Sequence, residues 1–172
     1  MNMGSRFGFP ASFAIALLGA VALPRIASAC SMPQGWTPQR AFAQAALVFH
    51  GLVTATELSS TKVKGPSADV SDGRILVNVR YETIEVFKGN PEANGTISTT
   101  TLIMGGCGVP VLTGQHFLFY VDGFNEKALK DSPELAGQTQ GMISIFDTQM
   151  LPPNPELLDE ALADVRALAK KH

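Results

Sequence analysis

Residues 74–87, RILVNVRYETIEVF, carry the clearest structural signal in the sequence. Apolar and polar residues alternate along most of this stretch, which is the period-two pattern of a β-strand. The alternation changes phase near Thr83. Beyond it, Ile84 and Val86 continue the apolar series on the face opposite to Tyr81. We therefore predict a long strand with a bulge or strong coil near Thr83.

Four further segments are rich in apolar, β-branched and aromatic residues and are predicted to be strands. They are residues 47–58, 96–104, 117–121 and 142–146. Gly51 lies inside the first of them, where a glycine commonly marks a bulge or corner. Polar segments with Gly or Pro separate the strands and are predicted to be loops. They are residues 59–73, 88–95 and 122–141, the last with a surface turn at Ser132-Pro133.

Helices are expected on both sides of this strand-rich region. Thr37 followed by Pro38 is the start signal of a short helix that we expect to reach Ala46. Asn154 begins a second helix that we expect to end near Lys170. One stripe of this helix is apolar and consists of Leu158, Leu162, Val165 and Leu168. Five short, bent strands and a packing helix predict a mainly β protein built as a small closed or partly open barrel.

The first 29 residues have the features of a secretory signal peptide. Arg6 gives a positive start, residues 13–23 (FAIALLGAVAL) are apolar, and residues 27–29 (ASA) form a small-residue cleavage site. The eleven apolar residues are well short of the roughly 20 that a membrane-spanning helix needs. We therefore expect an exported protein, periplasmic or extracellular, with no spanning segment after cleavage.

Residues 30–172 are expected to form a single domain, with the barrel at about 47–148 and the C-terminal helix at about 155–170. The signal segment contains Arg6 and Arg25 and no acidic residue, so its removal changes the formal net charge from −2 to −4. A mildly acidic chain argues against a nucleic-acid-binding protein. The same balance argues against binding to a membrane surface through basic residues.

Motifs of the common enzyme classes are missing from the sequence. It contains no HExxH, GxSxG, P-loop or CxxC motif, and we predict no enzymatic activity, no cofactor and no metal. His50 and His116 each lie at the edge of an apolar run with no second ligand spaced nearby, so we interpret both as histidines at the barrel rim. Four scattered methionines are interpreted as core residues rather than copper ligands. They are Met32, Met104, Met142 and Met150.

Cleavage after Ala29 would make Cys30 the first residue of the mature protein, and two modifications are then open. The first is acylation, as in bacterial lipoproteins, although their processing site usually has Leu where Ala27 stands here. The second is a disulfide with Cys107, the other cysteine, in an oxidising compartment.

Several short motifs follow one another in a characteristic order. They are Cys30-Ser31, residues 46–51 (ALVFHG), residues 86–89 (VFKG), Cys107-Gly108, and Gly114 with residues 117–120 (FLFY). With these motifs, residues 30–121 resemble the superfamily of tissue inhibitors of metalloproteinases and netrin modules, in particular its bacterial exported members. The resemblance implies a five-stranded OB-fold Greek-key barrel in which Cys30 is disulfide-bonded to Cys107.

The resemblance also implies a function. In the animal inhibitors the α-amino group and carbonyl of the first Cys chelate the zinc of a metalloprotease, and the next residue enters its specificity pocket. Cys30 would thus be the chelator, Ser31 the pocket residue and Cys107 the anchor. Met32 stands where the superfamily usually has a second Cys. The predicted function is a metalloprotease inhibitor; the alternative is a non-inhibitory structural or binding module of the cell envelope, with lipid anchoring at Cys30 as one form.

Overall fold

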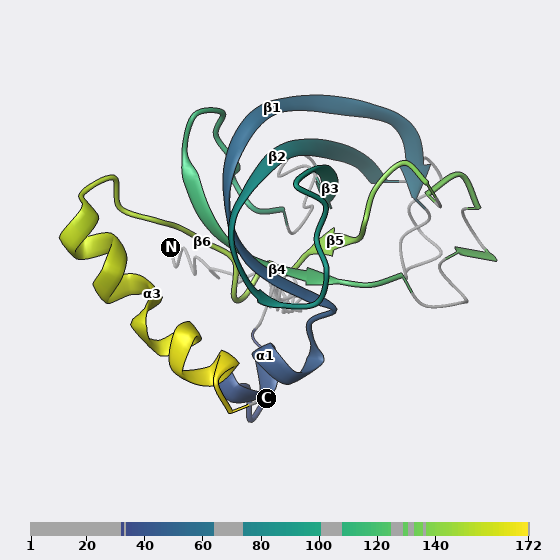
Figure 1. The fold of residues 1–172 in the computed structure, drawn as a ribbon. Helices are drawn as coiled ribbons and strands as arrows, with labels where there is room; N and C mark the ends of the chain where they lie inside the picture. Colours follow the sequence, from purple (N-terminus) through teal and green to yellow (C-terminus); the bar gives the residue numbers. More distant parts are fainter. Residues whose placement is uncertain are drawn as a thin grey trace, which may run out of the picture.

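The computed structural model in Figure 1 describes residues 32, 34–63, 74–100, 108–124, 129–130, 133–135 and 137–171. The predicted signal peptide lies outside the described residues, as does the end of the predicted strand 96–104. The helices and strands follow in the order α1 (Pro38–Gln44), β1 (Leu47–Val63), β2 (Arg74–Lys88), β3 (Asn94–Thr100), β4 (His116–Asp122), the 3-10 helix η2 (Pro133–Leu135), β5 (Met142–Ile143), β6 (Gln149–Met150) and α3 (Pro155–Ala169).

Five of the strands close into a mixed barrel. Antiparallel pairs join β1 to β2, β2 to β3, β5 to β4 and β4 back to β1, and a parallel pair joins β3 to β5. The short strand β6 pairs with β4. The predicted fold class is confirmed: the protein is mainly β, with a closed five-stranded barrel, a short helix near its N-terminal region and a C-terminal helix. Among the described residues, no helix is both long and apolar enough to cross a membrane.

The predicted bend at Gly51 and the predicted irregularity near Thr83 are two sides of one bulge. His50 pairs with Glu85 across the β1–β2 ladder. Gly51 pairs with Thr83, so Ile84 is an extra residue on β2. A bulge of this kind bends the strand and increases its twist, as a small barrel requires.

The limits of several other predicted elements were wrong. β1 continues to Val63 because its far end pairs with the start of β2, so the predicted loop 59–73 begins later. The predicted strand 142–146 ends at Ile143, since the chain then turns and the N–H of Thr148 donates to the carbonyl of Ser144 at 3.3 Å. The sequence analysis also missed β6, whose two residues are too few for a periodic signal.

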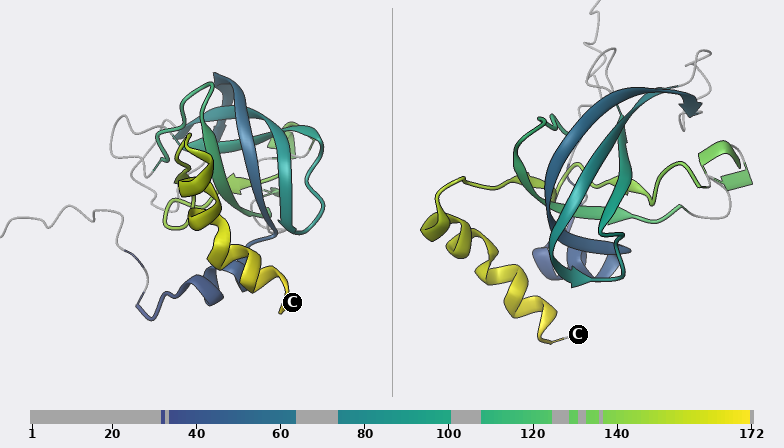
Figure 2. Two further views of the ribbon diagram at one scale, coloured as in Figure 1. Left: turned by 60° about the vertical axis from the view of Figure 1, so that its left-hand side comes forward. Right: turned by 45° about the horizontal axis from the view of Figure 1, so that its top comes forward.

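The side chains form two cores, one inside the barrel and one outside it. The inner core contains Phe49, Val53, Val79, Tyr81, Ile97, Val109, Phe117, Phe119, Val121 and Ile143. The outer core lies between the barrel and the two helices, and contains Ala41, Phe42, Ala45, Val48, Leu118, Tyr120, Leu151, Leu162, Val165 and Leu168. Alternation along β1 and β4 divides the residues between the cores. Figure 2 shows α3 running along the outside of the barrel, with α1 beside its C-terminal end.

Both helices begin where the sequence predicts. The side chain of Thr37 accepts a hydrogen bond from the N–H of Arg40 at 3.2 Å, which caps α1. The side chain of Asn154 accepts from the N–H of Glu156 at 2.9 Å and of Leu157 at 3.4 Å, which caps α3. The predicted apolar stripe of α3 then faces the outer core.

Candidate functional site

The residues of the predicted inhibitory site lie outside the described part of the chain. They are Cys30, Ser31 and Cys107, so the disulfide and the acylation both stay predictions. The first described residue is Met32, and its side chain is 58% exposed. Met32 and Met150 are both exposed, so their interpretation as core residues was wrong. Met32 precedes the first helix, and Met150 lies on the two-residue strand β6.

The segment leading into α1 is attached to the turn after β5 through Trp36. Its indole Nε1 donates to Asp147 Oδ1 at 2.8 Å, and its ring centroid lies 6.2 Å from that of Phe146. The hydroxyl of Ser144 donates to the other oxygen of Asp147 at 3.0 Å. The guanidinium of Arg40 lies 6.0 Å from the centroid of the Trp36 ring, within range of a cation–π contact. Because a hydrogen bond to a carboxylate is stronger than one between neutral groups, this contact is a firm attachment point.

Two of the motifs behind the resemblance touch each other beside α1. Gly89 has a φ of 76°, and a Cβ there would lie 2.5 Å from the carbonyl oxygen of Ala46, so the position requires glycine. The ammonium group of Lys88 donates to the carbonyl oxygens of Phe42 and Ala43 at 2.7 and 2.8 Å. These carbonyls lie at the C-terminal end of α1, where the helix dipole favours a cation. The VFKG motif therefore holds α1 against the barrel.

His50 and His116 form a contact that the sequence analysis missed. The Nε2 atom of His50 lies 2.9 Å from the Nδ1 atom of His116, and the ring centroids are 5.1 Å apart. No second ligand lies near either histidine in the sequence, but the pairing of β1 with β4 brings the two side chains together. In the β1–β4 ladder His116 lies opposite Leu52, and His50 is its diagonal neighbour on the same face. We call these two residues the histidine pair.

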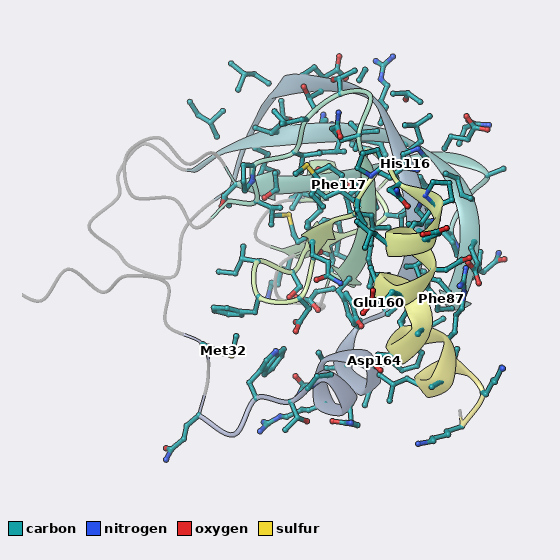
Figure 3. The ribbon with its side chains drawn as sticks, turned by 90° about the vertical axis from the view of Figure 1, so that its left-hand side faces the viewer. Met32, Phe87, His116, Phe117, Glu160 and Asp164 are labelled. Carbon is teal, nitrogen blue, oxygen red and sulfur yellow. The ribbon has the colours of Figure 1, made fainter. Side chains whose placement is uncertain are left out.

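Charged side chains from two elements surround the histidine pair. Glu85 lies opposite His50 on β2, and Arg166 of α3 donates to both carboxylate oxygens of Glu85, at 3.0 and 2.8 Å. Arg166 also donates to Asp159 at 3.0 Å. Burial lowers the pKa of His50, and so does the charge of His116; Glu85 opposes this shift, while Arg166 adds to it. Figure 3 shows His116 on the side of the barrel along which α3 runs.

A polar pocket of about 380 Å³ opens between β2, β3 and residues 137–140. Within it, the Tyr81 hydroxyl donates to the side-chain oxygen of Gln140 at 2.5 Å. Burial, together with the charge of Glu92, raises the pKa of Tyr81 to about 12, so the phenol stays protonated at neutral pH. The other side chains that line the pocket are amides, hydroxyls, Arg80 and Glu92. None of them is a nucleophile paired with a base.

Among the described residues, no group of three or more His, Cys, Asp and Glu side chains is arranged to hold a metal ion. A comparison of the chain with models of known protein families found no matching family, and a comparison with curated proteins found no match.

Proposed function

We propose that the mature protein is an exported barrel module, similar to the tissue inhibitors of metalloproteinases, that inhibits a zinc metalloprotease through Cys30 and Ser31. The observation that supports this proposal best is the attachment of the N-terminal segment. Trp36 is bound to Asp147, whereas Met32, four residues earlier, is 58% exposed. A segment that is fixed at Trp36 and exposed at Met32 is suited to carry an inhibitory terminus.

The chemistry of such a terminus is simple. The α-amino group and the carbonyl oxygen of Cys30 would form a five-membered chelate with the protease zinc and displace its bound water, which is the nucleophile. Binding costs less free energy when the ligand is already ordered. In this mechanism the Trp36–Asp147 contact and a disulfide between Cys30 and Cys107 hold the N-terminal segment in order before it binds. It assigns no catalytic residue to this chain.

Val109, two residues after Cys107, is held against the barrel. The backbone N–H of Val109 donates to the side chain of Thr99 on β3 at 3.0 Å, and the side chain of Val109 belongs to the inner core. This contact supports the idea that the proposed disulfide would tie the N-terminus to a well-held part of the barrel.

The test compares two purified oxidised proteins, one beginning at Cys30 and one with a single alanine added before it. Both are assayed against a panel of zinc metalloproteases, with serine proteases as the control class. We expect the first to inhibit at least one zinc enzyme and the second to lose about 100-fold or more in affinity, because the added residue removes the free amine from the chelate. Equal inhibition by the two proteins would contradict the mechanism.

A non-inhibitory module of the cell envelope is the second candidate. It is favoured by the exposed apolar side chains of Ile84 and Val86, which project from one face of β2 beyond its pairing with β3. Acylation of Cys30 and a disulfide at Cys30 exclude each other, because both use the same thiol. The intact mass of the mature protein separates the two, since acyl chains on Cys30 exclude both the disulfide and the free-amine chelate, whereas an unmodified chain that lacks two hydrogens excludes the lipid anchor.

A further inference from the structure

The histidine pair is a second feature of this protein with a chemical consequence, independent of the proposed inhibitory terminus. His50 is 3% exposed and lies on the outer face of β1, while His116 is partly exposed on β4. Their facing nitrogens are 2.9 Å apart, which is the length of a hydrogen bond. The register of the β1–β4 ladder fixes the two backbones relative to each other.

The number of protons that this geometry accepts is limited. A neutral imidazole carries one N–H and a charged imidazole carries two. When the pair is neutral or holds one positive charge, a single N–H can occupy the space between His50 Nε2 and His116 Nδ1. When both rings are charged, both facing nitrogens carry hydrogen, and two N–H groups cannot point at each other across 2.9 Å. Taking up the second proton therefore breaks the contact.

The surroundings connect this contact to α3. The charged groups that act on His50 are Glu85 from β2, Arg166 from α3 and His116 itself from β4. Glu85 is held by two hydrogen bonds from Arg166, and Asp159 of α3 binds the same guanidinium. A second positive charge on the histidine pair would repel Arg166 and compete with it for Glu85.

We propose that the histidine pair is a proton-dependent contact that couples acidification to release of α3 from the barrel. In neutral solution the shared hydrogen bond joins β1 to β4, and Arg166 joins α3 to β2. In acid the rings separate, the ion pair weakens, and the apolar stripe of α3 loses its place on the outer core. An exported protein meets such changes directly, because the pH outside the cytoplasm follows the surroundings.

The sign of the pH dependence follows from proton counting. In the unfolded chain both histidines titrate near pH 6.5. In the folded chain the pair takes up one proton fewer until the contact breaks. The contribution of the histidine pair to the free energy of unfolding is therefore fully present above about pH 6.5 and decreases as the pH falls below it. A difference of one proton lowers the folding equilibrium constant about tenfold per pH unit.

The experiment measures histidine ring titration by NMR on the folded protein, together with urea unfolding at several pH values between 8 and 4.5. We expect the pair to take up its protons in two coupled steps, the second at distinctly lower pH than the first. We expect His116→Gln to reduce the loss of stability per pH unit without abolishing it, because the variant removes the second facing proton and the charge of His116, whereas burial still lowers the pKa of His50. His50→Gln removes the buried ring and should reduce the loss further, and the partly exposed His116 keeps the test available if the buried variant fails to fold.

His172→Gln is the matched control, since it removes the third histidine of the sequence and should keep the pH dependence of the wild type. Independent titration of His50 and His116 near pH 6.5 would overturn the proposal. So would an unchanged pH dependence of unfolding in His116→Gln. A Zn²⁺ titration completes the set: simultaneous shifts of both rings at micromolar Zn²⁺ would assign the pair to metal binding instead, and unchanged rings support the proton-dependent contact.

Discussion

The two segments that lie outside the barrel are attached to it by different kinds of contact. The N-terminal segment and α1 are held by the Trp36–Asp147 hydrogen bond, by the buried ring of Phe42 and by Lys88, which binds the end of α1. The C-terminal helix α3 is held by its apolar stripe and by Arg166, whose carboxylate partner Glu85 neighbours the histidine pair.

The two attachments differ in the ionisable groups that take part in them. The contacts named for the N-terminal segment contain no histidine, whereas His50 and His116 neighbour the ion pair of α3. Histidine is the side chain that ordinarily changes its charge between pH 5 and 8. Acidification should therefore loosen α3 and leave the N-terminal attachment, which the proposed inhibitory function needs, in place.

The largest expected effect concerns the N-terminal attachment. Phe42 is 1% exposed between α1 and the barrel. Phe42→Ala should lower the free energy of unfolding by about 3–5 kcal/mol through lost burial and a cavity, measured by urea unfolding. The control Gln39→Ala, on the exposed side of α1, should change it by less than about 0.5 kcal/mol. Equal effects of the two would show that α1 does not pack as described.

The corresponding change in α3 uses two leucines of the same helix. Leu162 is 0% exposed and Leu157 is 53% exposed. Leu162→Ala should cost about 2–5 kcal/mol, whereas Leu157→Ala should stay within about 0.5 kcal/mol, both measured by urea unfolding at pH 7.5. A small effect of Leu162→Ala would mean that α3 contributes little to stability, and the comparison between the attachments would fail.

Removal of the acceptor for Trp36 should have a smaller effect. Asp147→Ala leaves the indole N–H without its partner and should lower stability by about 1–2 kcal/mol. Trp36 is the only tryptophan of the chain, so its fluorescence reports on this attachment alone. We expect quenching by acrylamide to increase in Asp147→Ala and to stay unchanged in Asp164→Ala, an exposed position on α3.

The smallest expected effect concerns the ion pair of α3. The side chains of Arg166 and Glu85 are each 36% exposed, so solvent screens their interaction. Arg166→Gln should lower stability by about 0.5–1 kcal/mol at low salt, and less at high salt. Arg80→Gln, which removes the more exposed pair with Glu57, should cost less than Arg166→Gln. The reverse order would show that the α3 ion pair is unimportant for docking.

The sequence predicts the barrel well for a physical reason. Strand periodicity, the glycine inside β1 and the capping residues of both helices are local signals, and each of them places an element or a bend. The bulge is an example, since Gly51 and the phase change at Thr83 mark it independently on the two strands that share it.

The contacts that hold the two segments on the barrel could not be predicted from the sequence alone. His50 and His116 are 66 residues apart, and Trp36 and Asp147 are 111 residues apart. Only the register of β1 against β4 and the path of the turn after β5 bring them together. The histidine pair becomes foreseeable only once the register of β1 against β4 is known, and no local signal in the sequence gives that register.

Hydrogen exchange of the backbone amides at pH 7.5 and pH 5.0 tests the contrast between the attachments most directly. Protection factors, corrected for the intrinsic pH dependence of exchange, are compared for α1 and α3. We expect the protection of α3 to fall by up to about tenfold per pH unit below pH 6.5 and that of α1 to fall less, because Lys88 and Trp36 also hold the N-terminal segment. An equal fall in both helices, or an α3 whose protection does not change, would contradict the account.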